Sequence, residues 1–112
     1  IFYRPWGKYT NLFHGKGFLI KELVINPESS ISLQKHQHRS EHWTVASGKP
    51  KITINKNKFF KKPDESVFIN RGSIHRIENP FKKSVKIMEV QIGSILKETD
   101  IIRYKDIYGR VN

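Results

Sequence analysis

The sequence predicts an all-β domain arranged as a sandwich or a barrel. Short runs rich in Ile, Val, Phe and Thr occur along nearly the whole chain, and such runs are typical of strands. Clusters of Pro, Gly, Asn and Ser separate them at intervals of about eight to twelve residues, as turns do in these folds. No stretch shows sustained helical periodicity. The 112 residues fit one domain, so any site lies inside a single core or on its surface.

The expected elements follow one another from the N-terminus. Residues 1–17 show little alternation and are expected to form an arm packed on the barrel, which spans residues 18–112 and includes a C-terminal tail. Asn55 and Asn57 suit a hairpin turn, because Asn tolerates the positive φ that such turns need. Thr99 is a candidate N-cap for one helical turn over residues 99–102. The strands are predicted at residues 18–25, 30–34, 42–47, 51–55, 58–61, 66–69, 75–78 and 85–92.

The composition excludes several kinds of protein. The chain has no cysteine, which excludes disulfides, thiolate nucleophiles and Cys-ligated metals, and leaves His, carboxylate and amide groups as possible ligands. No apolar run approaches the roughly 18 residues of a membrane-spanning helix, so a soluble protein with no membrane partner is expected. The chain shows no signal segment at its start, and with the absence of cysteine this favours a cytoplasmic location.

The charge of the chain is strongly positive. Lys and Arg number 21 against 10 Asp and Glu, which gives a formal net charge of +11. This excess favours an anionic partner such as a nucleic acid, a membrane surface or a small anionic substrate. The lysines are scattered over turns and alternating strand positions, as on a solvated outer face, and no nucleic-acid-binding motif is present. A solvated outer face is therefore the favoured explanation of the charge, which suggests the sign of a partner and not its identity, and no nucleic-acid partner is expected.

Candidate metal ligands are concentrated at one point of the predicted sheet. Gln34, His36 and His38 stand two residues apart, so in a regular strand their side chains would share a face. Glu41 follows at the start of the next strand, where it can fold back toward them. Far along the chain, a turn precedes His75, which opens another strand. Ligands that converge from separate strands are what a metal centre needs, because one strand cannot surround an ion.

The spacing of these residues resembles the cupin superfamily. In the first cupin motif, two ligands are separated by one residue, then Glu follows after a gap, then six residues and Gly. Gln34 and His36, four residues, Glu41, six residues and Gly48 match it, with Gln in the place of the usual first His. The resemblance implies a single-domain cupin barrel, also called a double-stranded β-helix or jelly roll. It also implies one divalent metal ion, Zn in the first place and Mn, Co, Ni or Fe as alternatives.

Residues 64–79 resemble the second cupin motif, and their Gly, His and Asn positions complete the resemblance. His75 stands at the ligand position, so the implied ligands are Gln34, His36, Glu41 and His75. The chain departs from the two motifs at turns: Glu28 and Asp64 replace motif glycines, and Asn70 replaces the usual Pro. These departures affect loop conformation rather than the ligands.

A second register of the first motif is open. His36 and His38 themselves form a His-x-His pair, which would place Glu41 only three positions after the second His. We favour Gln34 and His36, because this register gives the four-residue gap and because phosphomannose isomerases carry a Gln-x-His pair. His38 and His42 would then surround the ligands or line the pocket.

A closer resemblance extends along most of the chain, to the C-terminal isomerase domain of type II phosphomannose isomerase/mannose-1-phosphate guanylyltransferase proteins. It implies interconversion of mannose 6-phosphate and fructose 6-phosphate, which supplies GDP-mannose for polysaccharide synthesis, and cupins commonly pair into homodimers. No Gly-rich nucleotide loop of the guanylyltransferase part is found. The resemblance is carried by residues 4–7 (Arg-Pro-Trp-Gly), 32–43, 65–67, 75–80, 89–91, 100–103 and 106–110.

This reaction requires a general base and a cation for the phosphate. Glu89 and Glu78 are the candidate bases, and Arg110 is the first choice for the phosphate, with Arg103 and Lys35 after it. A cupin that acts on another sugar phosphate, or an iron oxygenase, would keep the same ligands. A non-catalytic sugar-binding barrel would keep the fold without needing the base.

Overall fold

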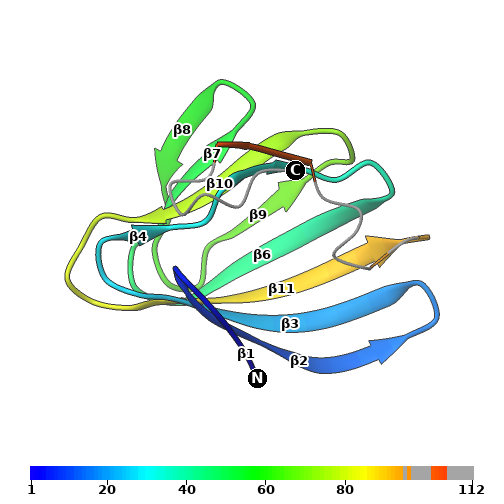
Figure 1. Cartoon of the computed structure of the whole chain (residues 1–112), viewed down its shortest axis with the longest axis horizontal. Helices are drawn as coiled ribbons and strands as arrows, with labels where there is room; N and C mark the ends of the chain where they lie inside the picture. Colours follow the sequence, from blue (N-terminus) through cyan, green and yellow to red (C-terminus); the bar gives the residue numbers. More distant parts are fainter. Residues whose placement is uncertain (95, 97–101, 106–112) are drawn as a thin grey trace.

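The computed structural model of the chain describes residues 1–94, 96 and 102–105, which form two facing antiparallel sheets (Figure 1). The order of the first sheet is β1 (Phe2–Arg4), β2 (Gly7–Gly15), β3 (Phe18–Ile25), β11 (Val85–Gly93), β6 (Arg39–Ser47) and β9 (Ser66–Ile69). The order of the second is β12 (Ile102–Lys105), β5 (Leu33–Lys35), β10 (Ile74–Asn79), β7 (Lys51–Ile54) and β8 (Asn57–Phe60), and β4 (Ser29–Ser30) also pairs with β10. Among the described residues, no helix is long and apolar enough to cross a membrane.

The predicted all-β class is confirmed, and most predicted strands are found within a few residues of their expected bounds. Strands β3 and β9 have the predicted bounds. The strand predicted over residues 30–34 is instead divided into β4 and β5. Ser30 lies opposite Glu78 and Gln34 lies opposite His75, so four steps on one side match three on β10. One extra residue between the two short strands therefore interrupts the ladder.

The segment before residue 18 corrects the expectation of an arm. Strands β1 and β2 form a hairpin, and β2 pairs with β3 along its length, so the segment extends the first sheet. Trp6 and Tyr9 are buried in the core. The second half of β2 is exposed at every residue, which removes the alternation that predicts a strand. Gly7 is required here, because a Cβ at its position would lie 2.0 Å from the Val24 carbonyl oxygen.

In the part of the chain that the structure describes, three turn residues other than glycine adopt positive φ. Asn55 has φ 54°, in agreement with the predicted hairpin turn. Glu28 (φ 55°) and Asp64 (φ 76°) stand where the cupin motifs carry glycine, so these turns have the left-handed conformation even though the residue differs. The predicted helical turn over residues 99–102 falls mostly outside the described residues, and Ile102 begins strand β12.

The hydrophobic core fills one end of the space between the sheets. On β11, Val85 and Ile87 are fully buried and face inward. On the facing sheet Ile52 and Ile77 are equally buried. Farther along the same strands, the inward positions become polar, and Glu89 and Gln91 on β11 are the clearest case. This polar end contains the candidate site.

Candidate metal centre

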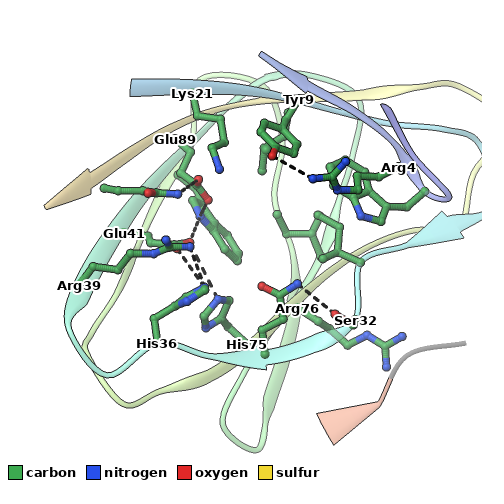
Figure 2. Close-up of a pocket in the computed structure, with 17 residues that line it drawn as sticks. Arg4, Tyr9, Lys21, Ser32, His36, Arg39, Glu41, His75, Arg76 and Glu89 are labelled. Atoms are coloured by element: carbon green, nitrogen blue, oxygen red, sulfur yellow. Dashed lines mark hydrogen bonds and ion pairs between the residues drawn. The ribbon is translucent and has the colours of Figure 1, made fainter. Parts of the chain in front are cut away.

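Three buried side chains converge at the polar end of the barrel interior (Figure 2). Glu41 comes from β6, His75 from β10, and His36 from the loop that joins β5 to β6. Their exposed fractions are between 2% and 4%. One possible ligand atom from each residue can be chosen so that all three lie within 4.8 Å of one another. These three residues are hereafter called the His/Glu cluster.

Local backbone bonds place the two histidines. The turn before β10 is tied to the loop of His36, because the Gly72 N–H donates to the His36 carbonyl oxygen at 2.8 Å. His75 Nδ1 lies 3.0 Å from the Ser73 carbonyl oxygen and therefore carries the proton. Its Nε2 keeps a lone pair, which lies 3.9 Å from Glu41 Oε1. A backbone acceptor on one ring nitrogen and a free lone pair on the other is the usual arrangement of a metal-binding histidine.

Arg39 closes the cluster on one side. Its Nε donates to Glu41 Oε2 at 3.0 Å, and its Nη2 lies 3.1 Å from His36 Nε2. Because an arginine can only donate, His36 Nε2 is the acceptor and bears a lone pair. His36 Nε2 and Glu41 Oε2 are thus two acceptors only 3.2 Å apart. Ligand atoms bound at about 2.1 Å to one ion lie about 3.0 to 3.4 Å apart, so the spacing of this pair suits a divalent cation that would replace Arg39 as the partner of the His36 lone pair.

Gln34 lies beside the cluster. It is directly opposite His75 in the pairing of β5 with β10, so the two side chains emerge on the same face. Its Nε2 donates to Ser32 Oγ at 3.0 Å, which leaves the carbonyl oxygen as the possible ligand atom. The donor set is then two imidazoles, one carboxylate and one amide, which suits Zn and its first-row neighbours.

A second carboxylate, Glu89, is joined to the cluster through Trp43. The Trp43 Nε1–H lies 3.0 Å from Glu41 Oε1 and 2.8 Å from Glu89 Oε1. Gln91 Nε2 donates to Glu89 Oε2 at 2.7 Å. Burial, with the nearby Glu41 carboxylate, raises the pKa of Glu89 to about 7. Burial lowers the pKa of His75, which favours the neutral ring that a metal requires.

These groups line one cavity of about 60 Å³, enough for a few water-sized groups. Its lining also contains Arg4, Tyr9 and Lys21, on the side away from the two histidines (Figure 2). Lys21 is 7% exposed, although it is charged. The cavity is therefore polar on both sides.

The structure brings five of the predicted site residues together. They line the cavity, and they are Gln34, His36, Glu41, His75 and Glu89.

Other predicted residues lie away from the cavity. Glu78 projects from the face of β10 opposite His75, and its Oε1 is 3.8 Å from Arg76 Nε, so it is not placed as a base. Lys35 follows Gln34 on β5 and projects from the other face. His38 is exposed, whereas His36 is buried, which agrees with the favoured register of the first motif.

Three further predicted residues either have side chains outside the described part of the chain or lie on the outer surface. Arg103 belongs to β12, where its backbone lies opposite Gln34, and its side chain is outside the described part of the chain. Arg110 lies outside the described residues. His42 is exposed, and its ring lies 4.7 Å from that of Phe68. It is therefore on the outer face of the sheet rather than on the pocket wall.

Several cavity residues were not foreseen from the sequence. Arg39 and Trp43 flank Glu41 at two-residue spacing, so alternation on β6 already places all three on one face. Lys21 stands at an inward position between Leu19 and Leu23, where an apolar residue is expected. A charged residue in the inward phase of a strand was the available signal.

Comparisons with known proteins agree with this arrangement. Residues 1–106 match the family described as mannose-6-phosphate isomerase C-terminal. The alginate biosynthesis protein AlgA of Pseudomonas putida is 44% identical over 110 residues, which cover 98% of this chain and 23% of that protein. The mannose-1-phosphate guanylyltransferase ManC of Salmonella typhimurium is 41% identical over 109 residues, covering 97% of this chain and 23% of that protein. The chain thus spans less than a quarter of the length of these curated relatives.

A solved structure supports the fold independently. The cupin domain of Cnp3 from Schizosaccharomyces pombe matches with a TM-score of 0.71 and 20% identity, covering 77% of this chain and 64% of that chain. At that identity the likeness shows the fold alone. The chain therefore has the cupin fold and belongs to the mannose-6-phosphate isomerase C-terminal family.

Proposed function

We propose that this member of the mannose-6-phosphate isomerase C-terminal family interconverts mannose 6-phosphate and fructose 6-phosphate. The observation that carries the proposal is a metal-ligand set and a separate carboxylate in one buried cavity. Glu89 lies 2.8 Å from the Trp43 N–H, which is itself 3.0 Å from Glu41. A non-catalytic sugar-binding barrel would not need this second buried carboxylate.

The reaction moves a proton between C1 and C2 of the sugar through a cis-enediol. We propose that Gln34, His36, Glu41 and His75 hold one divalent ion, with Zn first and Mn, Co, Ni or Fe as alternatives. When bound, this ion would supply electrostatic stabilisation of the charge that develops on the sugar oxygens. Arg39 neutralises and orients Glu41 through its 3.0 Å bond. It thereby keeps a buried carboxylate in position for this role.

We propose Glu89 as the general base. Trp43 and Gln91 hold its two oxygens at 2.8 and 2.7 Å, so the carboxylate has a defined direction. Its pKa of about 7 suits a group that must take a proton from one carbon and return it to the other near neutral pH. Glu78 has no comparable position and is not carried forward as a base.

The proposed substrate class is a small phosphorylated sugar. An anionic substrate suits the net charge of +11, and Arg110 and Arg103 stay candidates for its phosphate. The names of the relatives refer to alginate and to xanthan biosynthesis, which supports a place in the supply of polysaccharide precursors. A cytoplasmic location, a homodimer and the absence of nucleic-acid or membrane partners remain predictions.

The test is elemental analysis of the purified protein, followed by a coupled assay with mannose 6-phosphate. Glu89→Gln should reduce turnover by more than about 100-fold, as expected for loss of a general base, and should keep the metal. Glu22→Gln is the matched control, because Glu22 lies on the outward phase of β3. Metal-loaded wild-type protein that leaves mannose 6-phosphate unchanged would contradict the proposal and favour another sugar phosphate or a non-catalytic barrel.

A further inference from the structure

The cavity has a second polar side, formed by Arg4, Tyr9 and Lys21 and called here the cationic wall. Both cations lie against the same aromatic ring: Lys21 Nζ is 4.3 Å and Arg4 Cζ is 5.1 Å from the Tyr9 ring centroid. Arg4 Nη2 also donates to the Tyr9 hydroxyl oxygen at 3.1 Å. Figure 2 shows the Lys21 side chain directed into the cavity, with the His/Glu cluster on the other side.

Lys21 is the more deeply buried of the two cations in this wall. It occupies an inward position of β3 and is 7% exposed, so its ammonium has lost most of its hydration. Within the described part of the chain, no carboxylate oxygen lies within 4.0 Å of its Nζ and no hydrogen bond is formed by it. Its backbone partner on β11 is Glu89, whose carboxylate is instead held by Trp43 and Gln91. The Lys21 ammonium therefore keeps donors available for an anionic ligand in the cavity, although the Glu89 carboxylate is close enough to interact with it through charge.

The balance of charge in the cavity also favours an anionic ligand. Arg39 is paired with Glu41 at 3.0 Å, and Arg76 is near Glu78 at 3.8 Å. Among the described residues, the hydrogen-bond partners of Arg4 are the Tyr3 carbonyl and the Tyr9 hydroxyl, neither of which is an acid. With Lys21 it forms a cationic excess on one wall. A divalent cation on the opposite wall would add to this excess, so the cavity is suited to an anion.

We propose that the cationic wall binds the phosphate group of the sugar phosphate, with Lys21 and Arg4 as its donors and Tyr9 holding both in place. This inference rests on the proposed function for the identity of the substrate. It assigns the phosphate to the N-terminal hairpin and β3 rather than to the C-terminal tail. The sugar then lies between the two walls, with its reacting carbons toward Glu89 and the His/Glu cluster.

The test is equilibrium binding by titration calorimetry, which does not require turnover. The probes are inorganic phosphate, mannose 6-phosphate and mannose, each added to metal-loaded protein. Lys21→Met and Arg4→Met should each weaken mannose 6-phosphate and inorganic phosphate by roughly ten- to a hundred-fold, the loss expected for one charge-assisted contact. Arg4→Lys should restore part of the affinity, because it keeps the charge without the planar fork.

Matched controls are Lys86→Met and Arg71→Met, because both residues are exposed and lie outside the cavity lining. They should bind like the wild type. Unchanged affinity in Lys21→Met and Arg4→Met would overturn the inference, as would a loss found only in Arg103→Met or Arg110→Met. Failure of wild-type protein to bind either phosphate probe would also overturn it.

A wild-type measurement covers the case in which Lys21→Met does not fold. In amide NMR spectra, inorganic phosphate should shift the resonances of Arg4, Tyr9 and Lys21 and leave Lys86 unmoved. Shifts confined to other residues would contradict the inference. Protein that binds phosphate at this wall without isomerising mannose 6-phosphate would refute the proposed function alone. An active isomerase whose KM is unchanged in both variants would refute the inference alone.

Discussion

The two ends of the barrel interior are built from the same strands yet have opposite chemistry. Ile87 on β11 lies opposite Leu23 and Val45, and all three are buried and apolar. Two residues farther along, Glu89 lies opposite Lys21 and Trp43. The change from core to site thus occurs within one repeat of the pleat.

This difference shows how one small domain separates stability from function. Apolar side chains at the first end stabilise the fold because folding removes their surface from contact with water. At the second end, a buried charge needs a partner, which is another cavity residue for Glu41, paired with Arg39, and a ligand in the case proposed for Lys21. Replacing a polar cavity residue should therefore change metal binding or turnover, whereas replacing an apolar core residue should lower the free energy of unfolding. The following predictions test that separation.

The largest effect is expected from the ligands. His36→Ala and His75→Ala should each weaken metal binding by more than about 100-fold, because ligands matter more than the outer residues whose loss costs 10- to 100-fold. The β-type circular dichroism should be kept. His38→Ala is the control, since His38 is exposed, and it should retain the metal. Elemental analysis decides: metal lost with His38→Ala and kept with His36→Ala would reverse the assignment of the first motif.

The next effect belongs to the apolar end. Ile87→Ala should lower the free energy of unfolding by about 2 to 5 kcal/mol, because Ile87 is fully buried. The metal stoichiometry of the folded protein should not change. Urea denaturation measures the loss, and Ile92→Ala on the same strand is the control, with an expected cost below about 0.5 kcal/mol because Ile92 is 44% exposed. Equal costs at the two positions would contradict the placement of the core.

Glu89 should make the stability of the metal-free protein depend on pH. Its pKa is about 7 when folded, against an ordinary value of 4.5, so between these pH values the folded state holds more protons. The free energy of unfolding of the wild type, relative to Glu89→Gln, should therefore fall as pH rises through this window, by about 3 kcal/mol. Urea denaturation of both proteins at several pH values tests this. A difference that does not vary with pH would mean that Glu89 titrates normally.

The smallest effect on the fold is expected from removing the metal. Chelation should abolish isomerase activity, whereas the β-type circular dichroism should persist at room temperature, because the apolar end does not include the ligands. Adding the metal back should restore activity. Loss of the β signal on chelation would show that the polar end is needed for folding.

Particular residues show what could be predicted from the sequence. Alternation and turns predicted β3 and β9 with their observed bounds. The motif spacing predicted that His36, Glu41 and His75 lie close together, as they do in the structure. Strand β2 was missed because its exposed second half has no buried face to produce alternation.

Two other errors could have been avoided by following the alternation along a single strand. Lys21 stands between Leu19 and Leu23 in the inward phase of β3, so alternation along that strand already marked it as a buried cation. Glu78 was considered as a base although it stands three residues after His75, a spacing that places it on the opposite face. Counting phase along β10 would have removed it.

The extra residue between β4 and β5 acts as a change of phase in the second sheet. Ser29 lies opposite the inward Asn79, so strict alternation would direct Leu33 inward and Gln34 outward. Ile31 shares the phase of Ser29 and faces the core, and the added step is what brings Gln34 opposite His75. If the same residues paired with β10 without this bulge, Leu33 would lie opposite His75, and the ammonium of Lys35 would share the inward face. A single unpaired backbone position therefore decides whether this strand offers a ligand or a positive charge to a metal.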